Sequence, residues 1–282
     1  MREPKTTPGI IMPVSLLLIR AFSGMSAACL IALLLFNGCQ TLQGNIGETA
    51  RPLMSIVYYP YGPAIDRSIA SPHPDFSGWS DQRMRMDLRR IHRAGFDQII
   101  LRIDLPYLQN DPSTYASRVR HFIDMAHALA SSDSPGIVIE LDCDQILQMD
   151  IDLNSVLRWV ESLKLHEAHV YSKLEGLPLI RLRGESTPKK LKHVGLAIDD
   201  NDRDEVRLIA GKYNRIAMKA DSWLIPRDKG KTAIHEMKRA VQSGTSSIVL
   251  ESWNDFWSGS FIQPNSLDKD IALERVSRYL RR

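Results

Sequence analysis

Cysteine is scarce in this sequence, with only three in 282 residues, and the formal net charge of +3 is small. Lysine and arginine are spread along the chain apart from one short run, PKKLKH, which is typical of a solvated loop. A nucleic-acid partner is therefore not indicated. The sequence also lacks internal repeats and low-complexity segments, so its composition is that of a globular protein with one large domain or two small ones.

The first part of the chain departs from this ordinary composition. Arg2, Lys5 and Arg20 precede the apolar stretch MSAACLIALLLFNGCQ, which is too short to be a good membrane-spanning helix. Cys39 follows Gly38, and the stretch resembles a bacterial lipoprotein signal peptide, in which the cysteine becomes the lipidated first residue. An ordinary signal, or a single-pass anchor that includes IIMPVSLLLI, is the alternative.

This interpretation divides the chain into three parts. We expect a lipoprotein-type signal over 1–38, a polar linker over 39–51 and a folded domain over 52–282. The protein would be membrane-anchored in the bacterial cell envelope. Because Gln40 rather than Asp follows the cysteine, we expect the outer membrane, facing the periplasm. With Cys29 removed and Cys39 lipidated, only Cys143 remains, so no disulfide is expected and Cys143 is predicted to be a buried residue.

Several families of enzyme are excluded by missing motifs. No Gly-rich loop follows the first strand-like segment, so a nucleotide is not indicated, and no G-x-S-x-G elbow is present. The eight histidines are scattered. His166 and His169 are three apart, which permits shared metal ligation, but surface or capping roles explain them more simply. We expect neither a cofactor nor a metal.

Strand-like and helix-like segments alternate along the rest of the chain. Strand-like segments such as 53–62, 97–106 and 136–144 are separated by helical patterns, of which 80–96 and 113–129 are the clearest. This order predicts an α/β fold with a mostly parallel sheet. About seven strand candidates come close to the eight of a TIM-type (β/α)8 barrel, in a short or irregular form. A doubly wound open sheet is the rival.

Alternation within the strands favours the barrel. In IVIELD, Glu140 and Asp142 share one side while the apolar residues share the other, so the strand becomes charged on one face near its C-terminal end. An open sheet covered on both faces should not show this repeatedly. An exposed antiparallel face and a structural ion-pair network are the alternatives. Other residues placed on the polar side are Asp104, Arg181, Arg183, Asp199, Lys219, Asp221, Glu251 and Trp253.

A polar barrel mouth of this kind suits a carbohydrate. Sugar hydroxyl groups need hydrogen-bond donors and acceptors at fixed positions, and aromatic faces stack on sugar rings. Glycoside hydrolysis usually needs two carboxyl groups, one kept protonated and one ionised. The sequence offers many carboxylates without indicating which pair would face a substrate.

The stretch SWNDFWSGSFIQP resembles a motif of the family 99 glycoside hydrolases and their WbsX-like relatives, Trp/Phe-Asn-Glu-Trp-x-Glu-Gly-x-x-Ile-Glu-Pro. VYYPYG looks like that family's opening strand, and DLRRIHRAGFDQIILRID like its helix leading into the second strand, so the resemblance spans most of the chain from about Ile56. The matching motif residues are Ser252, Trp253, Asn254, Gly259, Ile262 and Pro264.

The resemblance implies a barrel that acts on α-linked mannose-type glycans with retention, assisted by the 2-hydroxyl of the sugar. The motif's two carboxylates would act as base on that hydroxyl and as acid/base at the leaving oxygen. The first falls on Asp255, which has a shorter side chain, and the second on Ser258. A hydroxyl cannot replace a carboxylic acid as general acid. The later Glu of the pattern is Gln263.

Three hypotheses follow. The chain is a glycosidase in which Glu251 or Asp221 takes the acid role beside Asp255, a non-catalytic glycan-binding lipoprotein of polysaccharide assembly or export, or a purely structural envelope protein. The partner is a polysaccharide or oligosaccharide in the first two. The residues expected to bind it are Tyr59, Asp104, Glu140, Asp142, Arg181, Arg183, Asp221, Trp253, Asn254 and Trp257.

Overall fold

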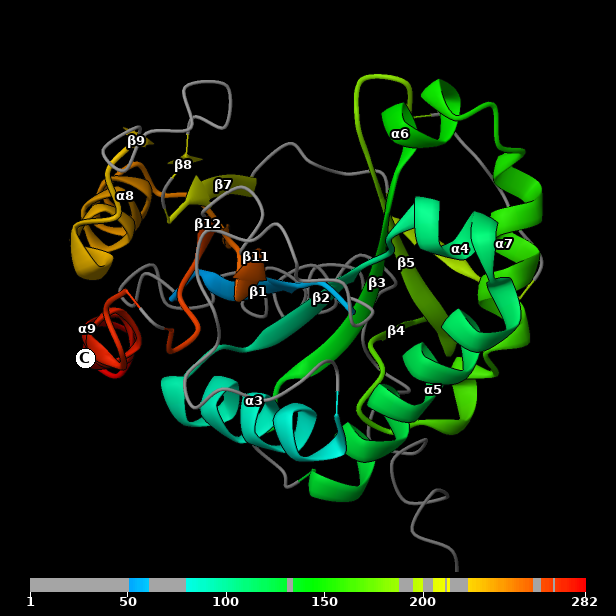
Figure 1. The fold of residues 1–282 in the computed structure, drawn as a ribbon, viewed down its shortest axis with the longest axis horizontal. Helices are drawn as coiled ribbons and strands as arrows, with labels where there is room; N and C mark the ends of the chain where they lie inside the picture. Colours follow the sequence, from blue (N-terminus) through cyan, green and yellow to red (C-terminus); the bar gives the residue numbers. More distant parts are fainter. Residues whose placement is uncertain are drawn as a thin grey trace, which may run out of the picture. The chain divides into compact units, whose positions relative to one another are not determined.

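The computed structural model (Figure 1) falls into two compact units, Met1–Ala50 and Arg51–Arg282. Only the second unit is described below, so the expected signal segment and Cys39 lie outside the described residues. Among the helices that are described, none is both long and apolar enough to cross a membrane. The structure describes residues 51–60, 80–130, 134–187, 195–199, 205–210, 212–213, 223–255, 260–265 and 267–282.

A curved, mainly parallel sheet forms the centre of this unit (Figure 1). Its parallel strands lie in the order β6-β5-β3-β2-β1-β10-β7, and β4 pairs antiparallel with β5. Within the described ranges, β6 and β7 do not pair with each other, so the barrel is not closed there. The strands are β1 Leu53–Tyr58, β2 Gln98–Arg102, β3 Gly136–Asp142, β4 Lys173–Leu174, β5 Leu177–Arg183, β6 Ala197–Asp199, β7 Glu205–Ile209 and β10 Ser247–Glu251.

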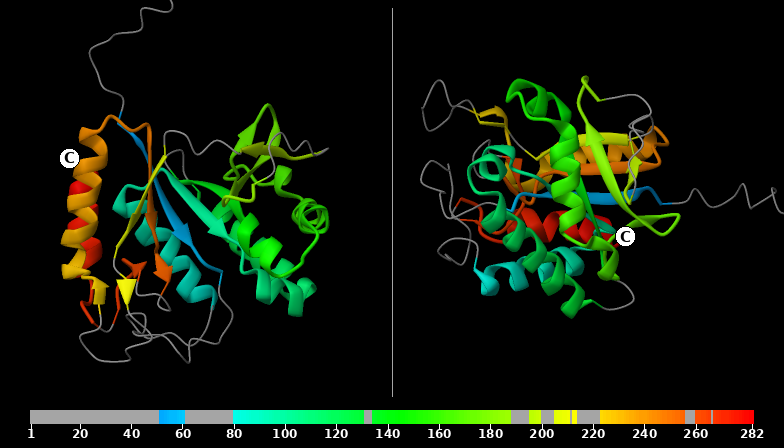
Figure 2. Two further views of the ribbon diagram at one scale, coloured as in Figure 1. Left: turned by 90° about the horizontal axis from the view of Figure 1, so that it is seen from above. Right: turned by 90° about the vertical axis from the view of Figure 1, so that its right-hand side faces the viewer.

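Helices cover the outer side of the sheet (Figure 2). The long ones confirm the predicted helical segments, and short helices α4 and α6 directly follow β2 and β3. Local interactions set both ends of α3. The Ser80 hydroxyl accepts the Arg83 N–H at its start, and Gly95, with φ 93°, ends the helix. The helices are α3 Asp81–Ala94, α4 Leu105–Asn110, α5 Pro112–Leu129, α6 Cys143–Gln148, α7 Leu153–Ser162, α8 Lys231–Gln242 and α9 Ile271–Leu280, with 3-10 turns η1 Leu165–Glu167 and η2 Asp228–Gly230.

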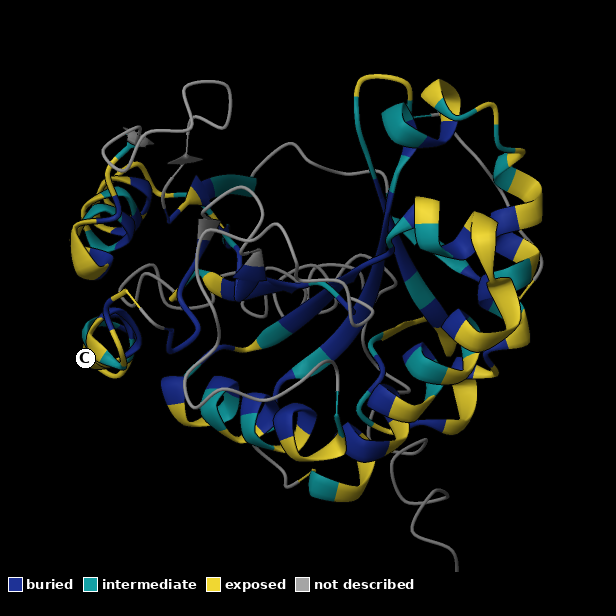
Figure 3. Ribbon diagram, in the orientation of Figure 1, coloured by how far each residue is buried: buried dark blue, intermediate teal, exposed yellow. Residues whose placement is uncertain are grey.

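The two faces of the sheet differ as the alternation predicted. The helix-facing side carries the main hydrophobic core, where residues such as Ile99, Leu101 and Ile139 are fully buried. Each such side chain contributes about 1.5–3 kcal/mol relative to exposure. Among the described residues, the inner side holds a small apolar cluster of Val57, Ile100, Val138 and Val249. Figure 3 shows the sheet buried and the outer helix faces exposed. The parallel pairing of the main strands excludes a bare antiparallel face.

The C-terminal third of the chain is less regular than the sequence predicts. The expected strand-like segment 204–213 breaks into β7 and β8 (Lys212–Tyr213), and β8 pairs antiparallel with β9 (Trp223–Ile225) in a separate sheet. Only the last residue of the expected strand 215–223 is described, so its assignment to the barrel stays a prediction. After β10, β11 (Asn254–Asp255) pairs antiparallel with β12 (Ser260–Phe261).

Candidate functional site

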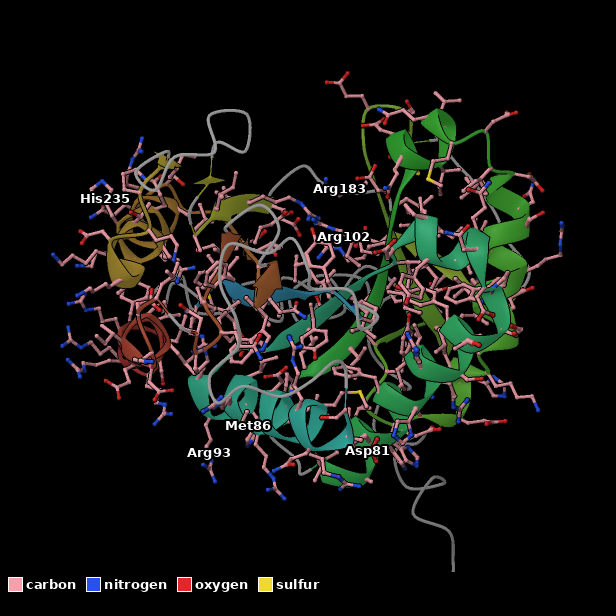
Figure 4. The ribbon with its side chains drawn as sticks, viewed as in Figure 1. Asp81, Met86, Arg93, Arg102, Arg183 and His235 are labelled. Atoms are coloured by element: carbon pink, nitrogen blue, oxygen red, sulfur yellow. The ribbon has the colours of Figure 1, made fainter. Side chains whose placement is uncertain are left out.

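Charged side chains converge on the inner side of the sheet, toward the C-terminal ends of the strands. Arg102, Arg183 and Glu251 are the last residues of β2, β5 and β10, and Glu140 and Arg207 lie inside β3 and β7. Figure 4 places the labelled Arg102 and Arg183 close together in this region. The parallel register brings these strand ends to one edge, as the sequence predicted for a barrel mouth.

Glu251 is the centre of this network. Its Oε1 lies 2.6 Å from Nη2 of Arg102, 3.0 Å from Nη1 of Arg183 and 3.0 Å from Nη1 of Arg207. Its Oε2 accepts a second hydrogen bond from Arg102, at 2.8 Å. Both oxygens therefore receive donors from within the protein, and three guanidinium groups surround one carboxylate.

Glu140 forms the buried floor of the network. Its side chain is 0% exposed, and its Oε1 lies 2.6 Å from Nη2 of Arg102. Arg207 also donates to both of its oxygens and lies 2.9 Å from Glu205. Such a buried cluster is tolerable only when its charges are paired. This pairing is the structural ion-pair network that the sequence left open as an alternative.

The remaining charges balance the cluster. Arg183 also pairs with Asp142, at 3.1 Å, and Arg181 pairs with Glu205. The network thus contains four cations and four carboxylates, and its formal charge is zero. The cations are Arg102, Arg181, Arg183 and Arg207, and the carboxylates are Glu140, Asp142, Glu205 and Glu251.

These contacts decide the ionisation of the two glutamates. Burial alone would raise the pKa of Glu251, but the hydrogen bonds and charges of Arg102, Arg183 and Arg207 outweigh it and lower the pKa to about 2. Burial is likewise outweighed at Glu140, whose pKa is lowered by Arg102 and Arg207. A general acid must carry a proton at the working pH. The acid role expected for Glu251 does not fit this environment.

This shift predicts a specific loss of stability in acid. The depressed folded-state pKa of Glu251 contributes about 2–3 kcal/mol that is present above pH 4.5 and lost as the pH falls toward 2. We expect wild-type unfolding free energy to decline over this range, and Glu251→Gln to remove that part of the decline. Urea unfolding at a series of pH values checks it. Identical pH profiles for the two proteins would contradict the assignment.

Asn254 joins the motif to the first strand instead of facing the mouth. Its Oδ1 accepts the Tyr59 N–H at 2.9 Å and its Nδ2 donates to the Tyr59 carbonyl at 2.8 Å. Its side chain is 1% exposed. Tyr59 itself lies at the mouth, where its hydroxyl accepts a hydrogen bond from Arg102 at 2.6 Å. Asn254 is therefore a structural clamp, which corrects the expectation that it binds substrate.

Trp253 is also placed differently from the expectation. Its side chain is 0% exposed and belongs to the helix-side core, although the alternation had put it on the side of Glu251. The reason is that β10 ends at Glu251, so the period of two does not continue beyond that residue. The Trp253 backbone N–H donates to the Val57 carbonyl at 2.7 Å. Trp253 fixes the motif to β1 and is not available to stack on a sugar.

A second buried polar cluster holds the far end of the motif. Gln263 donates from Nε2 to Asp87 at 2.6 Å and accepts from Arg83 at 3.4 Å, and the Tyr58 hydroxyl donates to Asp87 at 3.0 Å. Asp87 and Gln263 are 0% exposed. Burial raises the pKa of Asp87, although Arg83 and the hydrogen bonds oppose it. The Trp253 indole is among the neighbouring groups that lower the pKa of this carboxyl.

Two expected substrate-binding residues are helix caps. Asp104 accepts the Tyr107 N–H at the start of α4, and Asp142 accepts the Gln145 N–H at the start of α6. Burial raises the pKa of Asp104, partly offset by this backbone hydrogen bond. A carboxylate at a strand end is therefore explained by the short helix that follows it. The capping role removes Asp104 as evidence for a sugar-binding mouth.

Some of the predicted site lies outside the described residues. These positions are Asp221, Trp257 and Ser258, together with Lys219 and the Asp255 side chain. The backbone of Asp255 is described, and it pairs with Ser260 across β11 and β12. The roles predicted for these residues stay predictions.

Sequence reasoning missed Arg207 and Glu205, which face the inner side from β7. In EVRLI these two charged residues alternate with apolar ones, a pattern from which their place on the inner side could have been predicted.

Cys143 is buried as predicted, and burial raises the pKa of its thiol. The rings of His169 and His127 are tilted to each other with 5.2 Å between their centroids, and His166 is exposed. The described part of the chain contains no group of three or more potential metal ligands.

Comparisons by sequence find no matching family model and no matching curated protein. Solved structures do match. A GH99 endo-α-mannosidase from Bacteroides thetaiotaomicron superposes with a TM-score of 0.58 at 12% identity, over 81% of this chain and 96% of that one. Its complex with BIS-TRIS-propane gives a TM-score of 0.57 at 13% identity, over 82% and 97%.

A further structure, described as a glycoside hydrolase-like protein, matches with a TM-score of 0.54 at 10% identity, over 83% of this chain and 95% of that one. The chain therefore has a GH99-like fold, in a form whose barrel is open between β6 and β7 in the described ranges. The fold implied by the motif resemblance is confirmed.

Proposed function

We propose that this chain acts on a glycan at the C-terminal mouth of its barrel, and that it binds the glycan without hydrolysing it. The environment of Glu251 is the observation that favours binding over hydrolysis. Its two oxygens accept four hydrogen bonds at or below 3.0 Å from three arginines, and its pKa is about 2. Ser258 replaces the motif's second carboxylate. Neither residue can supply a proton to a leaving oxygen.

The mouth offers the groups that hydroxyl recognition needs. Arg183 is the most exposed member of the network, with 30% of its side chain accessible, and Arg207 follows with 21%. Tyr59 is half-buried beside them, with Arg102 5.4 Å above the centre of its ring. A charge-balanced surface of donors next to an aromatic ring suits a neutral sugar. Mannose-type glycans and bacterial surface polysaccharides are the proposed ligands.

Binding can be tested with one pair of variants. The wild-type chain is expected to bind a mannose-containing or bacterial polysaccharide on a glycan array, and Arg183→Met to weaken binding about tenfold or more, the loss of one charge-assisted hydrogen bond. Arg158→Met is the matched control, because Arg158 lies on α7 and is 64% exposed. Equal affinity for both variants, or no glycan bound by the wild type, would count against the proposal.

Hydrolysis is the second candidate, favoured by the position of Asp255. Asp255, on which the motif's first carboxylate falls, directly follows Asn254, and the Asn254 amide is hydrogen-bonded to the backbone of Tyr59. If the chain is a glycosidase, it should release reducing ends from one of these glycans, and Asp255→Asn should abolish the release. If the chain binds glycans but releases no reducing ends from any member of a broad glycan panel, hydrolysis is excluded and the binding function stands.

We also propose that the protein is lipid-anchored through Cys39 at the outer membrane, facing the periplasm. The support is the sequence alone, in which an apolar stretch ends in Gly38-Cys39-Gln40. Cys39→Ser is expected to move the protein from the membrane fraction to the soluble fraction of bacterial cells. Unchanged fractionation of the variant would argue against lipidation and leave the glycan proposal untouched.

A further inference from the structure

Three arginines form a line along the outer face of α3. Arg85, Arg89 and Arg93 are spaced four residues apart, which puts them on the same side of the helix, and all three are exposed. Given the rise per residue of an α-helix, they span about 12 Å along its axis. Figure 4 shows the labelled Arg93 pointing away from the sheet. The positive charges therefore follow one line on the surface.

The end of α9 continues this line. The C-terminal ends of α3 and α9 meet, because the guanidinium group of Arg281 donates a hydrogen bond to the Arg93 carbonyl. A methyl group placed on Gly95, directly after α3, would lie 3.7 Å from Cγ of Arg281. Arg281 is exposed as well. We call Arg85, Arg89, Arg93 and Arg281 the arginine row.

The arginine row is not neutralised by carboxylates. Among the residues that the structure describes, none of its four members forms an ion pair. The acidic residues on or beside α3 are engaged elsewhere, since Asp87 is buried, Asp97 pairs with Arg51 and Asp270 pairs with Arg90. The row is therefore a line of exposed and uncompensated positive charge.

Helix stability does not explain the row. Like charges four residues apart repel each other and destabilise a helix. A cation in the last turn, such as Arg93, interacts favourably with the helix dipole, but Arg85 and Arg89 lie before that turn. A row of mutually repelling cations on an exposed face indicates an anionic partner.

The surroundings of the row narrow the choice of partner. Helices that bind bilayers combine cations with exposed large apolar side chains. None of the described side chains of that kind lies on α3, and the one on α9, Ile271, is at the end away from Arg281. Sites for single-stranded nucleic acid stack bases on aromatic rings, and residues 85–93 contain no Phe, Trp or Tyr. Guanidinium groups bind carboxylates through paired hydrogen bonds, so a linear polymer that carries carboxylates fits the row.

We propose that the arginine row binds an extended acidic polysaccharide, one that carries uronic-acid carboxylates, along the outer wall of the barrel. The choice of a polysaccharide over other polyanions rests on the proposed glycan function, but the site is separate from the mouth. α3 ends shortly before β2 begins, so Arg93 lies toward the end of the sheet opposite the mouth and Arg85 lies nearer the mouth. A bound chain would follow the wall between the two ends of the barrel.

Titration calorimetry of the full chain with polygalacturonate, a linear polymer of uronic acid, tests this site. A row variant combines Arg85→Gln, Arg89→Gln and Arg93→Gln, and it is expected to bind at least about tenfold more weakly than the wild type. Wild-type affinity should fall as salt is raised, and the row variant should show a shallower salt dependence. Because the substitutions relieve repulsion between like charges, the row variant should unfold at a temperature no lower than that of the wild type.

The matched control removes three cations that already have carboxylate partners. The control variant combines Arg158→Gln on α7 with Lys231→Gln and Arg239→Gln on α8. It changes the net charge by the same amount as the row variant and should bind polygalacturonate as tightly as the wild type. Equal losses of affinity in the two variants would show that net charge alone determines binding, and would overturn the assignment to the row.

Other polyanions and the mouth are measured in parallel. Tighter binding of duplex DNA, or of vesicles that contain phosphatidylglycerol, than of polygalacturonate would overturn the polysaccharide and assign the row to a nucleic acid or a membrane. A wild-type chain that binds no polygalacturonate would refute the site outright. Binding of a neutral glycan at the mouth, which Arg183→Met weakens, should be unchanged in the row variant, so the results at the two sites are independent.

Discussion

Arg102→Ala is expected to lower the free energy of unfolding by about 3–5 kcal/mol, because it removes one partner from a buried ion-pair cluster. Glu140, which is 0% exposed, would lose its 2.6 Å contact and keep only Arg207. Glu251 would lose two of its hydrogen bonds. The uncompensated charge, rather than the lost packing, is the main cost. Urea unfolding at neutral pH measures the change.

The control is an arginine in a surface pair. Arg158 lies 3.6 Å from Asp152, and both side chains are more than half exposed. Arg158→Ala should change stability by about 0–1 kcal/mol. Arg102→Lys should recover only part of the loss, since an ammonium group cannot form the paired contacts of a guanidinium. Similar losses at Arg102 and Arg158 would show that the network is solvated and does not hold the barrel together.

The second large effect is expected at the far end of the motif. Gln263→Glu places a second carboxyl group 2.6 Å from Asp87, where both positions are 0% exposed. Two carboxylates this close cannot both ionise, so one must hold a proton at pH 7. Because pH 7 is roughly three pH units above the usual carboxyl pKa, keeping this proton bound lowers the free energy of unfolding by about 3–4 kcal/mol.

The pH dependence identifies this mechanism. The raised folded-state pKa means that the folded variant binds a proton that the unfolded chain has released, so stability falls as the pH rises from about 4 and recovers in acid. Gln242→Glu adds the same charge at an exposed position on α8 and should have little effect. Thermal unfolding between pH 4 and pH 8 distinguishes the two. A pH-independent loss at Gln263 would indicate disrupted packing instead.

Features that depend on residues close together in the sequence, such as strand alternation and helix caps, could be predicted. Period-two alternation in IVIELD placed Ile139 on the core side and Glu140 on the inner side, and both positions are confirmed. The helical pattern over 80–96 was confirmed as α3 for the same reason, because its caps at Ser80 and Gly95 depend on neighbouring residues alone. The GH99-like fold also followed from the order of these elements together with one motif.

What could not be predicted depends on contacts between distant segments. Glu251 is 149 residues from Arg102, 68 from Arg183 and 44 from Arg207, and the sequence does not reveal that all three converge on it. A charged strand end was interpreted as a binding site, while Asp104 caps a helix too short to predict. Trp253 was misplaced because alternation was extended past the end of its strand.

The segment that carries the motif is fastened at both ends. Asn254 binds the backbone of Tyr59 on one side, and Gln263 binds Asp87 on the other. Four residues, 256–259, connect β11 to β12 between these attachments. Because neither attachment uses a side chain of that connection, we expect Ser258→Glu, which restores the carboxylate of the motif, to leave both attachments intact. The sequence of this connection can therefore vary more freely than the two attachments on either side of it.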